Sequence, residues 1–191
     1  MTKSRLEAFS DGVIAILITI LVLELRVPHG SDFGALRPLL PTFLVYTLSF
    51  IYLAIYWNNH HHMLHTVQKV NGRILWANML LLFWLSLVPF VTGWMGENHF
   101  ASEPTALYGF VLLMAAIAYT NLQREIVVHH GPDSLLATAV GSDRKAKFSL
   151  LAYVAAIPLA FVEQWISDGI YIFVALIWLV PDKRIESKLD R

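Results

Sequence analysis

The sequence contains no cysteine, which excludes disulfide bonds, thiolate metal sites and cysteine nucleophiles. Charged residues are also scarce: they make up 15% of the 191 residues, against about 25% in an average soluble domain. The 14 basic and 14 acidic residues balance, so the charge does not favour binding to nucleic acid. Because neither a HExxH motif nor a nucleophile–base pair stands in the apolar segments, we expect no enzyme, no bound metal and no other cofactor.

Apolar residues dominate the remainder, at 57%, and the mean hydropathy of +0.57 is typical of integral membrane proteins. A bilayer core requires roughly 20 mostly apolar residues per helix. Six segments approach that length: Gly12–Val27, Leu39–Trp57, Ile74–Trp94, Thr105–Leu122, Phe148–Val162 and Ile170–Val180. Pro89 predicts a kink in the third segment, Pro158 interrupts the fifth, and Glu163–Gly169 predicts a tight hairpin before the sixth. We therefore predict an all-α, multi-pass protein, with residues 1–191 forming a single domain of six transmembrane helices.

The first apolar segment follows Lys3 and Arg5, as the apolar region of a secretory signal does. It is long enough to span a membrane, however, and Glu24–Arg26 follows it in place of a small-residue cleavage pattern. We expect a retained helix. Ser4 and Glu7 have the spacing of a capping box, which predicts that this helix begins near Ser4.

The basic residues predict the orientation of the six helices, because lysine and arginine gather in the cytoplasmic loops of membrane proteins. Of the 14 basic residues, only Arg26 and Arg37 lie on the face opposite the termini. The other face carries Lys3, Arg5, Lys69, Arg73, Arg124, Arg144, Lys145, Lys147, Lys183, Arg184, Lys188 and Arg191. We predict a protein of the cell membrane with both termini in the cytoplasm. The outer loops are expected to hold the acidic residues Asp32, Glu97, Glu103, Glu163 and Asp168.

Asp11 stands near the inner boundary of the first segment, where a carboxylate must be paired, hydrated or protonated. On a helix, Phe9, Ile16 and Leu23 form one stripe, and Asp11 lies about 140° from Ile16. The stripe is flanked by Thr19 and Ile20. We therefore expect the partner of Asp11 to come from another helix or another subunit.

Candidate partners lie at the inner end of the second segment, in Trp57–His65, and at Asn78 in the third segment, since tryptophan, histidine and asparagine side chains donate hydrogen bonds. The alternative is an ordinary interfacial belt of tryptophan and histidine. His61 and His65 share a helix face, but no acidic ligand stands close by in the sequence, so a metal site is not favoured. Ser167-Asp168-Gly169-Ile170 echoes Ser10-Asp11-Gly12-Val13 at the opposite membrane face, and we interpret so short a match as chance.

Arg5-x-x-x-Phe9-Ser10-Asp11 at the start of the first segment resembles the signature of the transmembrane protein 175 family of cation channels. The segments Trp57–His65, Leu75–Asn78 and Leu87–Phe90 are also similar to that family. The similarity of motifs covers the first three predicted spans. For the last three it rests on the number of spans and the length of the chain.

This resemblance implies a homotetramer in which the first helix of each subunit lines a central pore. It implies a hydrophobic constriction five residues after Asp11, at Ile16, with Thr19, Ile20 and Leu23 continuing the pore line. The signature residues would then join the pore helix to its neighbours instead of coordinating ions. With the polar residues of the second and third spans, they are Arg5, Phe9, Ser10, Asp11, Trp57, Asn58, His60, His61 and Asn78.

The resulting hypothesis is a weakly selective channel for K⁺ and other monovalent cations. No TVGYG-like filter occurs in the sequence, so selectivity by a ring of carbonyls is not expected. Its partners would be copies of itself and membrane lipid. A proton-permeable channel, an ion-coupled secondary transporter and a non-conducting scaffold are the alternatives. The histidines of 60–65 raise the further hypothesis of pH-sensitive gating.

Overall fold

The computed structural model describes residues 2–140 and 144–179, and within them the chain forms helices and no strands. The α-helices are α1 (Lys3–Ile20), α2 (Leu40–His65), α3 (Gly72–Ser86), α4 (Val88–Glu97), α5 (Ser102–His130), α6 (Leu135–Val140), α7 (Arg144–Leu159) and α8 (Gln164–Leu179). Two 3₁₀ helices, η1 (Leu21–Glu24) and η2 (Phe33–Leu39), flank the connection between α1 and α2. The predicted all-α class is confirmed.

Within residues 2–140 and 144–179, four helical segments are long and apolar enough to cross a membrane: Lys3–Glu24, Phe33–His65, Gly72–Glu97 and Ser102–His130. They correspond to the first four predicted spans. The fifth and sixth predicted spans overlap α7 and α8, which have 16 residues each. Of these two helices, only α8 is a shorter apolar helix by composition. Val180 at the end of the sixth predicted span lies outside the described residues, as do Lys183, Arg184, Lys188 and Arg191.

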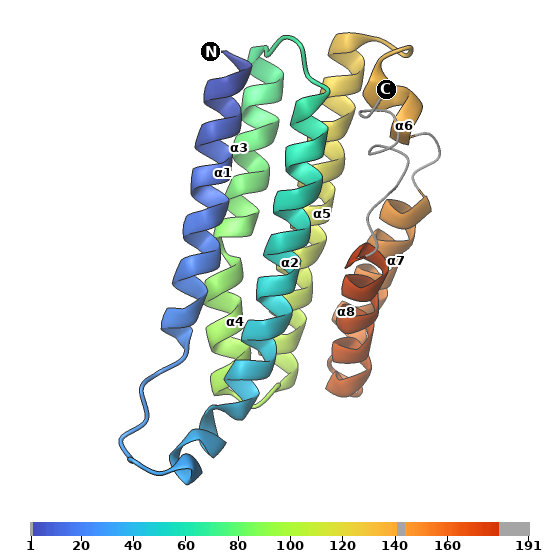
Figure 1. The fold of residues 1–191 in the computed structure, drawn as a ribbon. Helices are drawn as coiled ribbons and strands as arrows, with labels where there is room; N and C mark the ends of the chain where they lie inside the picture. The colour runs from blue at the N-terminus through green and yellow to red at the C-terminus, as the bar shows by residue number, and fades with distance from the viewer. Residues whose placement is uncertain (1, 141–143, 180–191) are drawn as a thin grey trace.

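The long helices lie side by side in one bundle, with α1 at one edge and the hairpin of α7 and α8 at the other (Figure 1). α1 packs against α2 and α3, while the hairpin packs against α5 and α2. α4 continues the line of α3 along α2 and α5. One side of α1 is therefore left without a neighbour among the described helices.

The ends of the first helix differ from the prediction. The helix begins at Lys3, with Thr2 at the N-cap, so Ser4 lies inside the first turn and the predicted capping box does not form. Glu7 instead pairs with Lys3 at 3.6 Å. The α-helix ends at Ile20, tightens into η1 and becomes extended at Leu25, earlier than the predicted end at Val27.

The third predicted span is divided as its proline indicated. α3 ends at Ser86 and α4 begins at Val88, which places Pro89 in the first turn of α4, where its missing N–H costs no helical hydrogen bond. The predicted hairpin at Glu163–Gly169 is wrong in position: α8 begins at Gln164, so the turn occupies residues 160–163.

Asp168 is the clearest departure from the predicted loops. It lies in α8 with 8% of its surface exposed, not in a solvated outer loop.

α8 approaches α5 closely beside Gly109. A Cβ atom on Gly109 of α5 would collide with the hydroxyl group of Tyr171, so this contact requires glycine.

Candidate pore helix and its polar contacts

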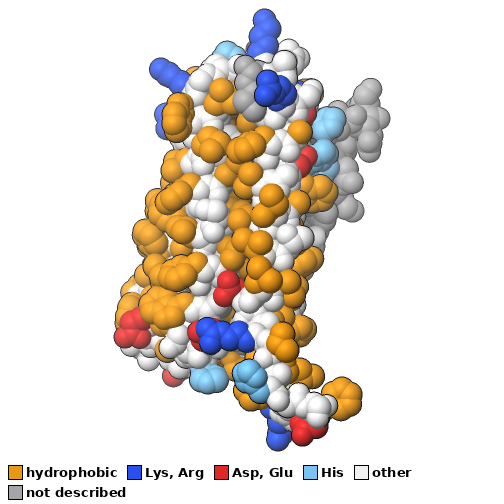
Figure 2. Space-filling model, turned by 90° about the vertical axis from the view of Figure 1, so that its left-hand side faces the viewer, with side chains coloured by type: hydrophobic (Ala, Val, Ile, Leu, Met, Phe, Trp, Pro, Cys, Tyr) orange, Lys and Arg blue, Asp and Glu red, His pale blue; other side chains and the backbone are white. Residues whose placement is uncertain are grey.

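α1 presents an apolar face that no other described residue covers. Phe9, Ile16 and Leu23 are 45%, 59% and 73% exposed, so the predicted stripe lies on this face. Figure 2 views the molecule from this side and shows hydrophobic side chains along most of its length, with basic side chains near both ends. The opposite face of α1 is buried against the bundle through Leu6, Ser10, Ile14 and Leu17.

The two other residues of the predicted pore line differ in position. Thr19 is exposed, and its hydroxyl donates to the carbonyl of Ile16 at 2.8 Å, which leaves the oxygen lone pairs free to face outwards. Ile20 is half-buried and packs against the hydrophobic core. Because η1 has about three residues per turn, Leu23 is also rotated from the position that a continuous α-helix would give it. The uncovered face thus contains Ile16, Thr19 and Leu23, but not Ile20.

The buried side of α1 is joined to two other helices by a chain of hydrogen bonds. Asn78 of α3 donates from Nδ2 to the hydroxyl oxygen of Ser10 at 3.0 Å. His60 Nε2 of α2 lies 2.7 Å from Asn78 Oδ1, and since that oxygen only accepts, Nε2 is the donor. All three side chains are at most 1% exposed. In this low-dielectric setting the chain fixes the position of α1 relative to α2 and α3.

Asp11 finds its hydrogen-bond donor on α2. Trp57 Nε1 donates to Asp11 Oδ1 at 3.0 Å, on the exposed side of the helix pair. The indole stacks on His61, with 5.9 Å between ring centroids, and His61 in turn contacts His65 at 5.2 Å. The partner thus comes from another helix of the same subunit.

Three of the predicted residues stand outside these contacts. Arg5 and Phe9 are exposed, and Asn58 is half-buried. None of them makes a side-chain hydrogen bond or ion pair to another described residue. Lys3, which the sequence did not single out, bonds the carbonyl of His65 at 2.8 Å and so ties the start of α1 to the end of α2. Across 2–140 and 144–179, no group of three or more histidine, aspartate or glutamate side chains is arranged to hold a metal ion.

A second buried polar cluster, which the sequence analysis missed, joins α2 to α4, α5, α7 and α8. Ser49 lies 2.6 Å from the hydroxyl oxygen of Thr92 and 2.9 Å from that of Tyr108. Tyr52 donates to the carbonyl of Tyr171 at 2.6 Å and accepts from Tyr153 at 3.2 Å. The available signal was the spacing of Ser49 and Tyr52, three residues apart on one face of an apolar helix.

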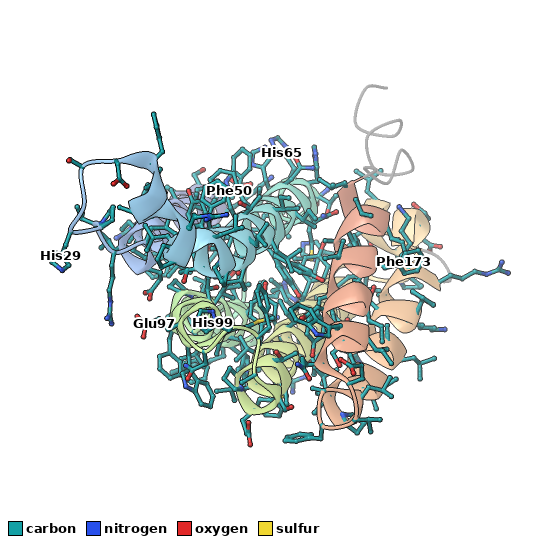
Figure 3. The ribbon with its side chains drawn as sticks, turned by 90° about the horizontal axis from the view of Figure 1, so that it is seen from below. His29, Phe50, His65, Glu97, His99 and Phe173 are labelled. Carbon is teal, nitrogen blue, oxygen red and sulfur yellow. The ribbon has the colours of Figure 1, made fainter. Side chains whose placement is uncertain are left out.

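The end of the bundle remote from the N-terminus carries charge on short loops. Arg26 Nη2 and Glu97 Oε1 form an ion pair at 2.7 Å, which connects the segment after η1 to the end of α4. Figure 3 views this end and shows Glu97 and His99 together, while His29 stands away on the connection to α2. Both side chains are largely exposed, so the pair contributes little to stability.

Comparisons with known proteins agree with this architecture. The model of the family described as endosomal/lysosomal potassium channel TMEM175 matches residues 5–89. A potassium channel of Chryseobacterium sp. (strain P1-3) is 58% identical over 189 residues, covering 99% of this chain and 98% of the relative. The endosomal/lysosomal proton channel TMEM175 of Gallus gallus is 35% identical over 101 residues, 47% of this chain and 20% of that protein.

Among solved structures, the crystal structure of a lysosomal potassium-selective channel TMEM175 homolog from Chamaesiphon minutus superposes with a TM-score of 0.83 at 30% identity. The match covers 94% of this chain and 97% of that one. Identity over nearly the full length and a common fold lead to one assignment: the chain belongs to the TMEM175 family of ion channels.

Proposed function

We propose that four copies of this chain form a potassium-permeable channel in the cell membrane, with α1 of each subunit lining a central pore. The observation that carries the proposal is the uncovered apolar face of α1, where Ile16 and Leu23 are 59% and 73% exposed. A second copy of α1 facing this side across an axis would give it a partner. Relatives of similar length that are named potassium channels support K⁺ as the permeant ion.

In this proposal the side chains of Ile16 form the narrowest ring of the pore. A ring of aliphatic side chains closes a pore by excluding water and opens it by moving apart. Above the ring, Thr19 offers hydroxyl oxygens whose own proton is already donated to the carbonyl of Ile16. A partly hydrated cation could exchange water for these oxygens, which favours the ion that loses water more easily. The expected selectivity for K⁺ over Na⁺ is weak.

The polar contacts beside α1 would hold the pore helix in register. The buried chain from His60 through Asn78 to Ser10 lies about 1.7 turns from Ile16 along α1, so it would restrain the helix near its constriction. The proposal also includes six spans per subunit, with α7 and α8 as the last two, and termini in the cytoplasm. The basic residues at the N-terminal end of the bundle support that orientation.

Proton permeation is the second candidate, because eukaryotic relatives of this chain are named proton channels. A hydrophobic ring that admits a file of water would also pass protons. Current carried in the absence of K⁺ and Na⁺, with a reversal potential that follows the pH gradient, would favour this reading over a potassium channel.

The deciding experiment is potassium flux from liposomes that contain the purified Ile16→Asn variant. An amide at the narrowest ring hydrates it, so we expect leak about tenfold or more above wild type, which corresponds to a barrier lower by about 1.4 kcal/mol. Ile172→Asn is the matched control, because Ile172 is 49% exposed on α8, far from α1. Unchanged flux in Ile16→Asn, or an equal increase in the control, would remove Ile16 from the conduction path.

A further inference from the structure

The connection between α2 and α3 lies beside the C-terminal end of α5, at the end of the bundle that carries the N-terminus (Figure 1). α5 ends in two consecutive histidines, His129 and His130. Each of them contacts the connection through a ring nitrogen. Neither takes part in the polar contacts around α1, and neither was singled out from the sequence.

His130 accepts hydrogen bonds from the backbone of the connection. The backbone N–H groups of Gln68 and Lys69 both donate to its Nε2 atom, at 3.1 and 3.3 Å. The other ring nitrogen, Nδ1, lies 2.9 Å from the carbonyl oxygen of Ile126, one turn earlier in α5. Since a carbonyl only accepts, Nδ1 carries the proton and Nε2 carries none. This set of contacts therefore requires the neutral imidazole.

His129 accepts in the same way from the side chain of Asn71. The Oδ1 atom of Asn71 accepts from the backbone N–H of Ile74 at 2.9 Å, as the N-cap of α3. Its amide nitrogen Nδ2 is then left facing Nδ1 of His129, at 3.0 Å. An amide nitrogen only donates, so Nδ1 of His129 is the acceptor and carries no proton.

Protonation of either imidazole would turn an acceptor into a donor, because both nitrogens of an imidazolium carry a proton. An N–H group of the ring would then face the N–H groups of the connection, and the hydrogen bonds between them would be lost. Histidine is the side chain whose charge ordinarily changes between about pH 5 and about pH 8. The contact is therefore present while the imidazoles are neutral and is lost as the pH falls through that range.

The charges around the two histidines do not oppose this effect. No described carboxylate lies within 4 Å of either imidazole, and Leu135–Val140 of α6 contains no ionisable side chain. The C-terminus of α5 attracts positive charge, but only weakly at an exposed helix end. Four of the ionisable side chains on the adjoining segments are basic and two are acidic, which does not favour an imidazolium. They are Lys69, Arg73, Glu125, Asp133, Arg144 and Lys145.

We propose that His129 and His130 form a pH-sensitive latch, which holds the α2–α3 connection against α5 at neutral pH and releases it on acidification. The release would loosen the end of α2, where the carbonyl of His65 accepts from Lys3 of α1 at 2.8 Å. The latch lies between segments of one subunit, so it does not depend on the proposed pore.

Amide hydrogen exchange of the full-length protein in detergent tests the latch, read by mass spectrometry on peptides that contain Gln68 and Lys69. After correction for the intrinsic effect of pH on exchange, wild type should lose protection about tenfold or more between about pH 7.5 and about pH 5.5. The double variant His129→Asn, His130→Gln places amide oxygens near Nδ1 and Nε2, and these oxygens accept but do not titrate. Its protection should not change with pH.

His62→Gln is the matched control, because the ring of His62 contacts His61 near the same end of α2 but makes no hydrogen bond to a described residue. This variant should keep the pH dependence of wild type. Equal protection of wild type at the two pH values, or a pH dependence that persists in the double variant, would overturn the proposal. Nitrogen NMR of the wild-type histidines tests it even where the double variant does not fold. His130 should carry its proton on Nδ1 at neutral pH, and a proton on Nε2 would overturn the latch.

Discussion

The tripeptide Ser-Asp-Gly occurs near the start of α1 and again near the start of α8, and the two copies have different surroundings. Both serines are fully buried. Ser10 accepts a hydrogen bond from Asn78, whereas Ser167 donates to the carbonyl of Ala156 at 2.7 Å. Asp11 is half-buried and accepts from Trp57. Asp168 is buried, and neither of its carboxylate oxygens has a partner among the described residues.

A short polar motif in an apolar helix therefore takes its role from the helices that face it. Beside α1, the facing helices supply an amide, an imidazole and an indole. Beside Asp168 they supply none of these to its oxygens. An uncompensated buried carboxylate is costly, and in a membrane protein such groups are usually retained for function. The two sites should therefore respond in opposite ways to substitution.

The largest effect is expected from Asn78→Leu, which breaks the α1 site at its centre. It leaves both His60 Nε2 and the hydroxyl of Ser10 buried without their partner, so we expect a loss of about 2 kcal/mol in the free energy of unfolding. Thermal denaturation of the purified protein in detergent measures it. Asn98→Leu at the exposed end of α4 is the control. An equally large loss of unfolding free energy in this control would mean that the buried hydrogen-bond chain adds no more stability than an exposed side chain does.

Asp168→Asn is expected to stabilise the protein by about 1 kcal/mol, because the amide replaces an unpaired buried carboxylate by a neutral group of the same shape. Asp11→Asn should not stabilise it, since the carboxylate there already accepts from Trp57. The melting temperatures of Asp168→Asn and Asp11→Asn, measured together at neutral pH, show whether the two aspartates differ as expected. A lower melting temperature for Asp168→Asn would indicate a partner for that carboxylate in the assembled protein.

Asp11→Ala should change the stability of the subunit by less than about 1 kcal/mol, since its hydrogen bond is exposed. We expect a clearer effect on assembly than on ion preference, because the residue positions α1. Native mass spectrometry reports the fraction of tetramer, and bi-ionic potentials report the preference. Normal tetramers with inverted selectivity would place Asp11 in the conduction path.

The smallest effect is expected from Trp57→Phe, which removes the indole donor to Asp11 but keeps most of the stacking on His61. We expect a loss of about 0.5 kcal/mol, measured by thermal denaturation. Trp76→Phe is the matched control, because Trp76 is 78% exposed on α3. A loss as large as that of Asn78→Leu would show that the exposed pair, and not the buried chain, holds α1 in place.

Sequence analysis located the elements that depend on local composition. Pro89 identified the break between α3 and α4 because proline acts within one turn. Helical periodicity placed Phe9, Ile16 and Leu23 on one face and Ser10 off it. It did not show that Ile20, which the resemblance assigned to the pore line, is half-buried and packs against the core at the end of α1. Nothing local revealed the contact of Tyr52 with Tyr153, which are 101 positions apart.

Hydropathy and charge are enough to identify an α-helical membrane protein, because they act through the bilayer and do not depend on which helices are neighbours. Motif similarity pointed to the family. Which polar groups meet depends on how the helices pack: Asn78 lies between His60 and Ser10, and Trp57 donates to Asp11. No described residue donates to Asp168. When a helix is apolar on all sides, the angular positions of its residues do not reveal which face is buried. That choice depends on how the helices pack, which is a property of the whole bundle.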